Sequence, residues 1–165
     1  MTATADLLAF AAAPHDLPPD VREAALRLIA DTLAVGAAGS SAPGADGVLA
    51  AARGWGADGA VPILGRGDTT LSGAGAAFVN GFQIHCLEWD AVHEGAVVHA
   101  MSVVVAAVHA VAHSRIGTSK EEVFTAVVVG VEISLIPLVA GLVLGLLAEV
   151  FAQGADLRDD VDGLV

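Results

Sequence analysis

The sequence is poor in the residues that build disulfides and aromatic clusters. Its 165 residues include one cysteine, Cys86, and no tyrosine, and aromatic residues make up only 4%. One cysteine cannot form a disulfide within the chain, and it also excludes a structural zinc site built from several thiolates. The N-terminal stretch has no basic residue before its short apolar run, unlike a secretory signal peptide. We therefore expect a cytoplasmic protein.

Positive charge is also scarce. Seven Lys and Arg residues stand against 19 Asp and Glu residues, for a formal net charge of −12. The cations are spread along the chain, whereas nucleic-acid binding needs a concentrated basic surface that neutralises phosphates. The sequence therefore excludes nucleic acid as a partner. A pocket for small anionic substrates would have to obtain cations from another segment or another chain.

Small and aliphatic residues are present in excess. Hydrophobic residues make up 55% of the chain, which is ample for a buried core. Alanine and leucine favour helices, whereas strands usually contain more β-branched and aromatic residues. We predict an all-α helical bundle that forms one domain or part of a larger one.

Apolar spacing and capping residues define the expected elements. The pattern from Val21 keeps helical spacing up to a glycine-rich segment at 36–47. Ser72 is expected to cap one helix, and Thr118 or Ser119 another. The predicted helices cover residues 4–13, 21–35, 46–53, 73–87, 99–112 and 119–133, and residues 61–64 form a brief extended segment.

The C-terminal part departs from this pattern. The segment "SLIPLVAGLVLGLLAEVFA" at 134–152 is apolar and nearly long enough to span a bilayer. Glu132, Pro137 and the lack of a flanking basic cluster argue against a membrane span, and burial against a partner explains the segment equally well. We therefore treat residues 1–133 as the helical domain and residues 134–165 as an apolar helix followed by an acidic tail.

Residues 85–100, "HCLEWDAVHEGAVVHA", gather three histidines, two glutamates and an aspartate within an otherwise apolar sequence. Three explanations compete: a solvated loop, a metal site, and part of an acid/base active site. Charged residues are ordinary in loops. The pairs His85–Glu88 and His109–His113 have spacings that occur in metal sites, but such spacings arise easily by chance, and we expect no metal.

An acid/base site would use the same residues differently. His99 follows the apolar run "GAVV" and lies close in sequence to Glu88 and Asp90. A histidine paired with a carboxylate can accept and release a proton near neutral pH, as removal of a proton next to a carboxylate group requires. The carboxylate also fixes the tautomer of the imidazole. We therefore favour His99 with Glu88 or Asp90 as the reacting pair.

The segments "ILGRGDTTLSGAGAAFVNGFQIHCLEWDAVHEGAVVHAMSVVVAAVHAVA" and "TAVVVGVEI" resemble the N-terminal part of the MmgE/PrpD family, and the resemblance covers about residues 5–133. That family includes 2-methylcitrate dehydratase and cis-aconitate decarboxylase. The resemblance implies a mostly helical large domain, a smaller α/β lid domain and a homodimer. It also implies a lyase that acts on small di- or tricarboxylates by elimination or decarboxylation, without a metal or cofactor.

By this resemblance, two acidic positions and one histidine of the family fall on Glu88, Asp90 and His99, which become the expected catalytic residues. The expected substrate-binding residues are Asn80, His85 and His93. Ala91, Val92 and Ala100 stand where the family usually has Asp, Thr and Pro, which affects the choice of substrate. The family's lid domain and later lysines have no counterpart here, so we expect a truncated or split enzyme. The alternative is a non-catalytic helical module that dimerises or binds a partner.

Overall fold

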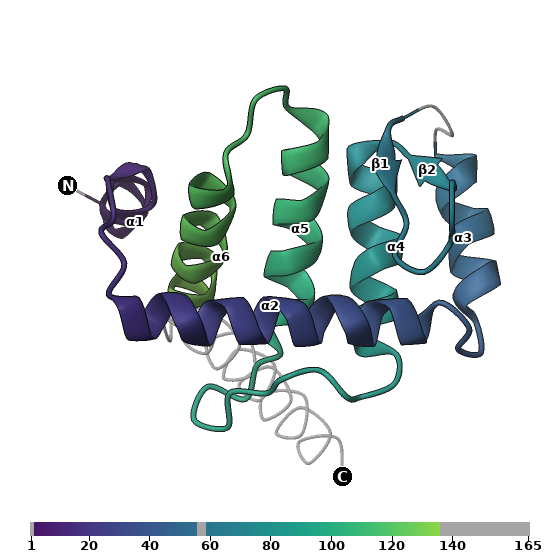
Figure 1. The fold of residues 1–165 in the computed structure, drawn as a ribbon, viewed down its shortest axis with the longest axis horizontal. Helices are drawn as coiled ribbons and strands as arrows, with labels where there is room; N and C mark the ends of the chain where they lie inside the picture. Colours follow the sequence, from purple (N-terminus) through teal and green to yellow (C-terminus); the bar gives the residue numbers. More distant parts are fainter. Residues whose placement is uncertain (1, 56–58, 136–165) are drawn as a thin grey trace, which may run out of the picture.

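A computed structural model describes residues 2–55 and 59–135. These residues form six helices and one small antiparallel sheet, in agreement with the predicted all-α class (Figure 1). The helices are α1 (Ala3–Ala12), α2 (Pro19–Gly39), α3 (Ala45–Gly54), α4 (Gly73–His85), α5 (Ala100–Ser114) and α6 (Lys120–Leu135), and the strands are β1 (Val61–Pro62) and β2 (Thr70–Leu71).

Helix α2 lies across one end of α4, α5 and α6 (Figure 1). Helix α4 packs between α3 and α5, and α6 packs on the other side of α5. One buried cluster joins α3, the sheet, α4 and α5 around Leu49, Leu71 and Val79. A second joins α5 and α6 around Met101 and Val127, where side chains of α2 cover it. The two cores hold both ends of the segment between α4 and α5 in place.

Helix α2 ends at Gly39, four residues beyond its predicted end at residue 35. The glycines of this last turn allow close packing and do not end the helix. A Cβ atom at Gly39 would lie 1.9 Å from the backbone oxygen of Gln83, and one at Gly36 would lie 2.7 Å from Leu64 Cδ1. At Gly39 the nearest atoms are backbone and cannot move aside, so glycine is required where α2 meets α4, whereas at Gly36 they are the ends of flexible side chains. The sequence pattern shows a glycine-rich segment, but it does not show that the first residues of this segment continue α2 and contact α4.

Two helix starts follow the predicted capping residues. The Ser72 hydroxyl accepts a hydrogen bond from the Gly75 amide at 3.3 Å, at the start of α4. At the start of α6, the Ser119 hydroxyl accepts from the Glu122 amide at 3.2 Å, and the Glu122 carboxylate accepts from the Ser119 amide at 2.7 Å. This reciprocal pair is a capping box. It also lowers the pKa of the Glu122 carboxyl, chiefly through the hydrogen bond from the Ser119 amide.

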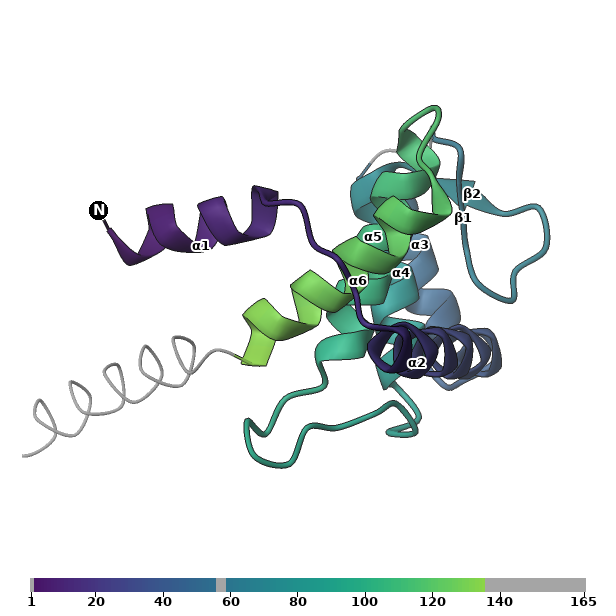
Figure 2. The ribbon, with the colours of Figure 1, turned by 60° about the vertical axis from the view of Figure 1, so that its left-hand side comes forward.

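Helix α1 stands apart from the other helices and contacts mainly α6 (Figure 2). Its larger apolar side chains are not covered, since Leu8 is 66% exposed and Phe10 is 41% exposed. An arm of this kind contributes little to the core of the described part of the chain.

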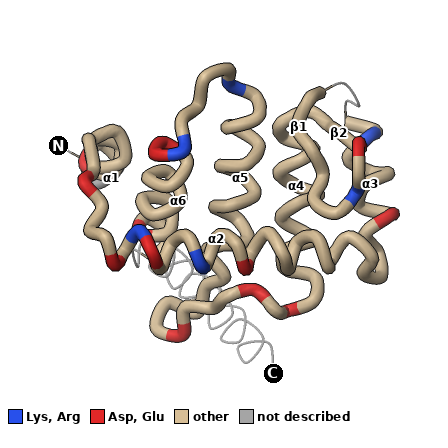
Figure 3. The backbone as a smooth tube through the Cα atoms, in the orientation of Figure 1, with Lys and Arg blue, Asp and Glu red and all other residues tan. Residues whose placement is uncertain are grey.

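The charged residues are distributed over several elements, and the described Lys and Arg residues form no continuous basic surface (Figure 3). Within residues 2–55 and 59–135, no helix is both long enough and apolar enough to cross a membrane. The apolar segment at 134–152 lies outside the described residues except for its first two positions.

Candidate functional site

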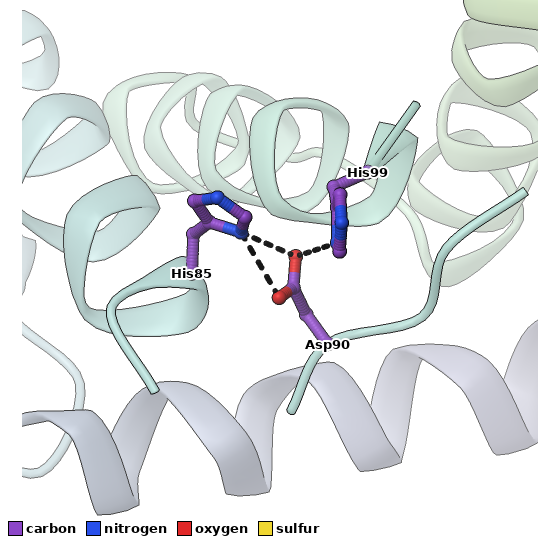
Figure 4. A group of neighbouring side chains, drawn as sticks. All are labelled: His85, Asp90 and His99. Atoms are coloured by element: carbon purple, nitrogen blue, oxygen red, sulfur yellow. Dashed lines mark hydrogen bonds and ion pairs between the residues drawn. The ribbon is translucent and has the colours of Figure 1, made fainter. Parts of the chain in front are cut away.

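Three of the predicted site residues meet where the α4–α5 segment begins and ends (Figure 4). His85 is the last residue of α4, and His99 is the N-cap residue of α5. Asp90 lies in the segment between them and points back toward both imidazoles. The Ser102 hydroxyl donates a hydrogen bond to the His99 carbonyl oxygen at 2.8 Å, which fixes the backbone from which the His99 ring extends.

Asp90 is the centre of this group. Its side chain has 0% exposure, and its Oδ1 lies 3.1 Å from His85 Nδ1 in hydrogen-bonding geometry. The Nδ1 atom of His99 lies 3.1 Å from Asp90 Oδ2, at ion-pair distance, although it is not aligned to form a hydrogen bond and has no other partner. The two imidazole rings lie edge to face with their centroids 4.6 Å apart.

The electrostatics follow from the burial of Asp90. A buried carboxylate is costly unless hydrogen-bond donors or positive charges surround it. In the described part of the chain no Lys or Arg side chain is ion-paired with Asp90, so the two imidazoles take this role. A carboxylate beside Nδ1 favours the tautomer in which Nδ1 carries the proton. The Nε2 atom of a neutral ring is then available to accept a proton from a substrate.

Glu88 lies at the edge of the group. It follows the end of α4, which ends two residues earlier than predicted, and its backbone is left-handed at φ 56°. Its side chain is 76% exposed and lies 3.6 Å from His85 Nε2. Of the two carboxylates expected beside His99, the structure places Asp90 there and places Glu88 beside His85.

Asn80 lies on another face of α4 and is completely buried. Its side-chain oxygen accepts from the Leu64 amide at 2.9 Å, and its amide nitrogen donates to the Pro62 carbonyl at 3.1 Å. Gln83, which the sequence did not single out, donates to the Leu64 carbonyl at 2.7 Å. Both amides join α4 to the segment after β1, so the structure gives Asn80 a structural contact.

His93 is exposed and forms part of a small turn. Its backbone amide donates to the Val98 carbonyl at 2.9 Å, and its Nδ1 accepts from the Ala96 amide at 3.1 Å. The bridge between His93 and Val98 closes a short excursion of the chain. Val97, just before the bridge residue Val98, has a left-handed backbone at φ 51°. His93 is thus held near the group but directed toward its own backbone.

The other histidine pair lies on α5, with ring centroids 4.2 Å apart. Burial and the neighbouring His113 both lower the pKa of His109. The ring of His109 lies 3.5 Å from the Asn80 amide, within the packing of α4 and α5. The pair thus belongs to the packing of α5 against α4.

A different set of residues has the geometry for a metal. The ligand atoms of His85, Asp90 and His99 all lie within 4.8 Å of one another. Two imidazoles and one carboxylate are donors that several divalent metals accept. Helical spacing relates His85 to Glu88 and does not reveal this set, because the chain reversal after α4 brings Asp90 and His99 to His85.

A groove of about 520 Å³ adjoins the same group, between α4 and α5. His85 and Ser102 line the groove at one end, and Phe78, Phe82 and Val103 line it further along. Spacing along the sequence did not reveal it, because it arises where two helices of small residues cross.

Comparisons with known proteins agree with the sequence resemblance. The family description "MmgE/PrpD N-terminal domain" matches residues 6–140. A cis-aconitate decarboxylase-like protein of Aspergillus oryzae (strain ATCC 42149 / RIB 40) is 30% identical over 125 residues, which cover 72% of this chain and 26% of that protein. The matched segment thus spans about a quarter of that relative's length. No solved structure matches the chain.

Proposed function

Because the chain belongs to the MmgE/PrpD family, we propose that it supplies one wall of the active site of a lyase that acts on small di- or tricarboxylates. In this proposal His99 is the acid/base, and Asp90 orients its ring. His85 and Glu88 contact the substrate or hold Asp90, and His93 contacts the substrate from the loop. The observation that carries the proposal is the buried Asp90 carboxylate between two imidazoles.

The chemistry asks for a base that can also act as an acid. In a dehydration, Nε2 of His99 would take the proton from the carbon next to a substrate carboxylate. The C–H electron pair then forms the new C=C bond, and the hydroxyl group leaves as water after receiving a proton. In a decarboxylation, the C–C bond to one carboxylate breaks, CO₂ leaves, and the imidazolium returns a proton to the carbon.

Substrate carboxylates need positive charge from outside this group. Among the described residues, Arg22, Arg27 and Arg66 form ion pairs with Glu121, Glu23 and Asp46, and none with Asp90 or Glu88. We therefore propose that a further protein segment, in the same chain or in a partner, supplies the cations. A homodimer is one way to bring them.

The test is a chimera, because the chain matches only 26% of its Aspergillus oryzae relative. Residues 6–140 would replace the matching segment of that protein, and turnover of cis-aconitate, citrate and 2-methylcitrate would be followed by proton NMR. The 165-residue chain alone would be assayed in parallel. We expect turnover by the chimera that is lost in His99→Ala and kept in His113→Ala, a control at an exposed histidine of the same helix. An active chimera that is indifferent to His99→Ala would contradict the proposal.

The alternative is a non-catalytic helical module, and the exposed apolar side chains of α1 favour it. A module of this kind would dimerise or bind a partner through such surfaces. This alternative predicts that sedimentation analysis shows a defined dimer, that His99→Ala leaves the dimer unchanged, and that the chimera is inactive.

A further inference from the structure

The groove between α4 and α5 differs in chemistry from the group of titratable residues that it adjoins. Among the described residues that line it, polar side chains lie only at the end with His85 and Ser102, and none is Lys or Arg. Phe78, Phe82 and Val103 form the apolar walls. A ligand that fills it therefore needs a polar head at one end and an apolar tail along the rest.

His85 belongs to both places. Its ring lies 3.1 Å from the Asp90 carboxylate, and the same residue lines the end of the groove. A substrate held against this group for reaction would therefore have the groove beside it. Two small residues, Gly81 of α4 and Ala106 of α5, also line the groove. A Cβ atom at Gly81 would lie 3.7 Å from Ala106 Cβ, which is an ordinary van der Waals distance.

The volume also bears on the ligand. Small-molecule sites occupy about 300–1,000 Å³, and this groove of about 520 Å³ falls within that range. A single methyl substituent would leave most of it empty. Cys86 also lines the groove, and burial raises the pKa of its thiol, so the group stays neutral and adds to the apolar wall.

We propose that the α4–α5 groove binds an alkyl chain of the substrate, so that the substrate class is a di- or tricarboxylate with a substituent of several carbons. This inference rests on the proposed function, which places the carboxylate-bearing carbon at His99. The alkyl chain runs from His85 past Phe82 toward Phe78 and Ala107.

The experiment uses the chimera, which includes the further segment proposed to supply the cations, and a series of dicarboxylates: succinate, 2-butylsuccinate and 2-octylsuccinate, each below its micelle concentration. Binding would be measured by titration calorimetry. Burial of each methylene should tighten binding about fourfold until the groove is filled. Ala107→Phe, at an exposed position of α5 that lines the groove, should remove most of this dependence on chain length. Ala50→Phe, at an exposed position of α3 away from the groove, is the matched control and should retain it.

Three results would overturn the inference. The first is equal affinity for succinate and 2-octylsuccinate, or no binding of either. The second is a chain-length dependence that persists in Ala107→Phe when circular dichroism shows the variant to be folded. Dissociation of a dimer by 2-octylsuccinate would assign the groove to a second copy of the chain and would overturn it too.

The chimera separates this inference from the proposed function. If the chimera turns over substrate through His99 but does not prefer alkyl-substituted substrates, only the groove inference fails. If 2-octylsuccinate binds in the groove but turnover does not depend on His99, the proposed function fails, and the assignment of the alkyl chain to a substrate fails with it.

Discussion

His85 and His99 share the carboxylate of Asp90, with the Nδ1 atom of each ring 3.1 Å from a different oxygen. The two histidines come from opposite ends of the α4–α5 segment. The carboxylate that joins them has no exposed side-chain surface. The Nε2 atom of His85 lies 3.6 Å from the exposed Glu88 carboxylate, so the arrangement predicts unequal roles for the two nearby carboxylates.

Asp90→Asn should lower the kcat of the chimera by about 10²–10⁴, because an amide cannot stabilise an imidazolium or hold the same tautomer. Glu88→Gln should have a much smaller effect, since Glu88 is 76% exposed and contacts only His85. Steady-state kinetics on both variants checks this. Equal losses in the two variants would show that Asp90 has no special role.

Metal removal should leave activity unchanged. The family resemblance implies a lyase without a metal, although His85, Asp90 and His99 have the geometry to hold one. The chimera would be dialysed against excess EDTA and assayed again. Activity that disappears and then returns with added zinc would assign the three residues to a metal instead.

The stability of the chain should fall as the pH falls below about 6.5, the ordinary pKa of histidine. Burial lowers the pKa of His109 in the folded chain, so the unfolded chain binds more protons in this range and the free energy of unfolding decreases. Urea unfolding at pH 5.5 and 7.5 measures the change. His109→Gln should reduce it, and an identical pH dependence in this variant would place the titration elsewhere.

Gly39→Ala should destabilise the chain by about 3 kcal/mol or more, because the added Cβ would lie 1.9 Å from the Gln83 backbone oxygen. Gly47→Ala is the matched control in another helix, where the added Cβ meets nothing within 4 Å. It should stabilise the chain by about 0.5–1 kcal/mol. Chemical unfolding of both variants checks the pair, and similar effects would mean that α2 and α4 can separate freely.

The helices and their caps could be predicted from the sequence because they depend on local signals. Ser72 and Ser119 are examples: each side chain bonds to an amide three residues away. The C-terminal end of α2 could not be predicted, because glycines usually indicate the end of a helix. Here Gly39 lies inside α2, where its lack of a side chain lets the backbone of Gln83, distant in sequence, approach closely. Strand β2 was missed for a similar reason, since a two-residue strand exists only through its partner.

The catalytic and binding roles of the candidate residues stay predictions, but their positions can be compared with the structure. The sequence offered Glu88 or Asp90 as the carboxylate beside His99, and the structure places Asp90 there. The contact between His85 and Asp90 was not foreseen, because helical spacing relates His85 to Glu88 and says nothing of a residue beyond the helix end. The complete burial of Asn80 was also hidden, since its partners Pro62, in β1, and Leu64, just after it, are distant from α4 in sequence.

The bridge between His93 and Val98 separates the α4–α5 segment into two parts with different freedom. Asp90 and His99 lie outside the bridge, where helix ends and buried side chains fix them, whereas the residues that it encloses reach into solvent. Substitutions, insertions or deletions within the enclosed turn can therefore accumulate while the geometry of His85, Asp90 and His99 is retained. In the proposed lyase, such a segment would be a place to acquire new substrate contacts without rebuilding these three residues.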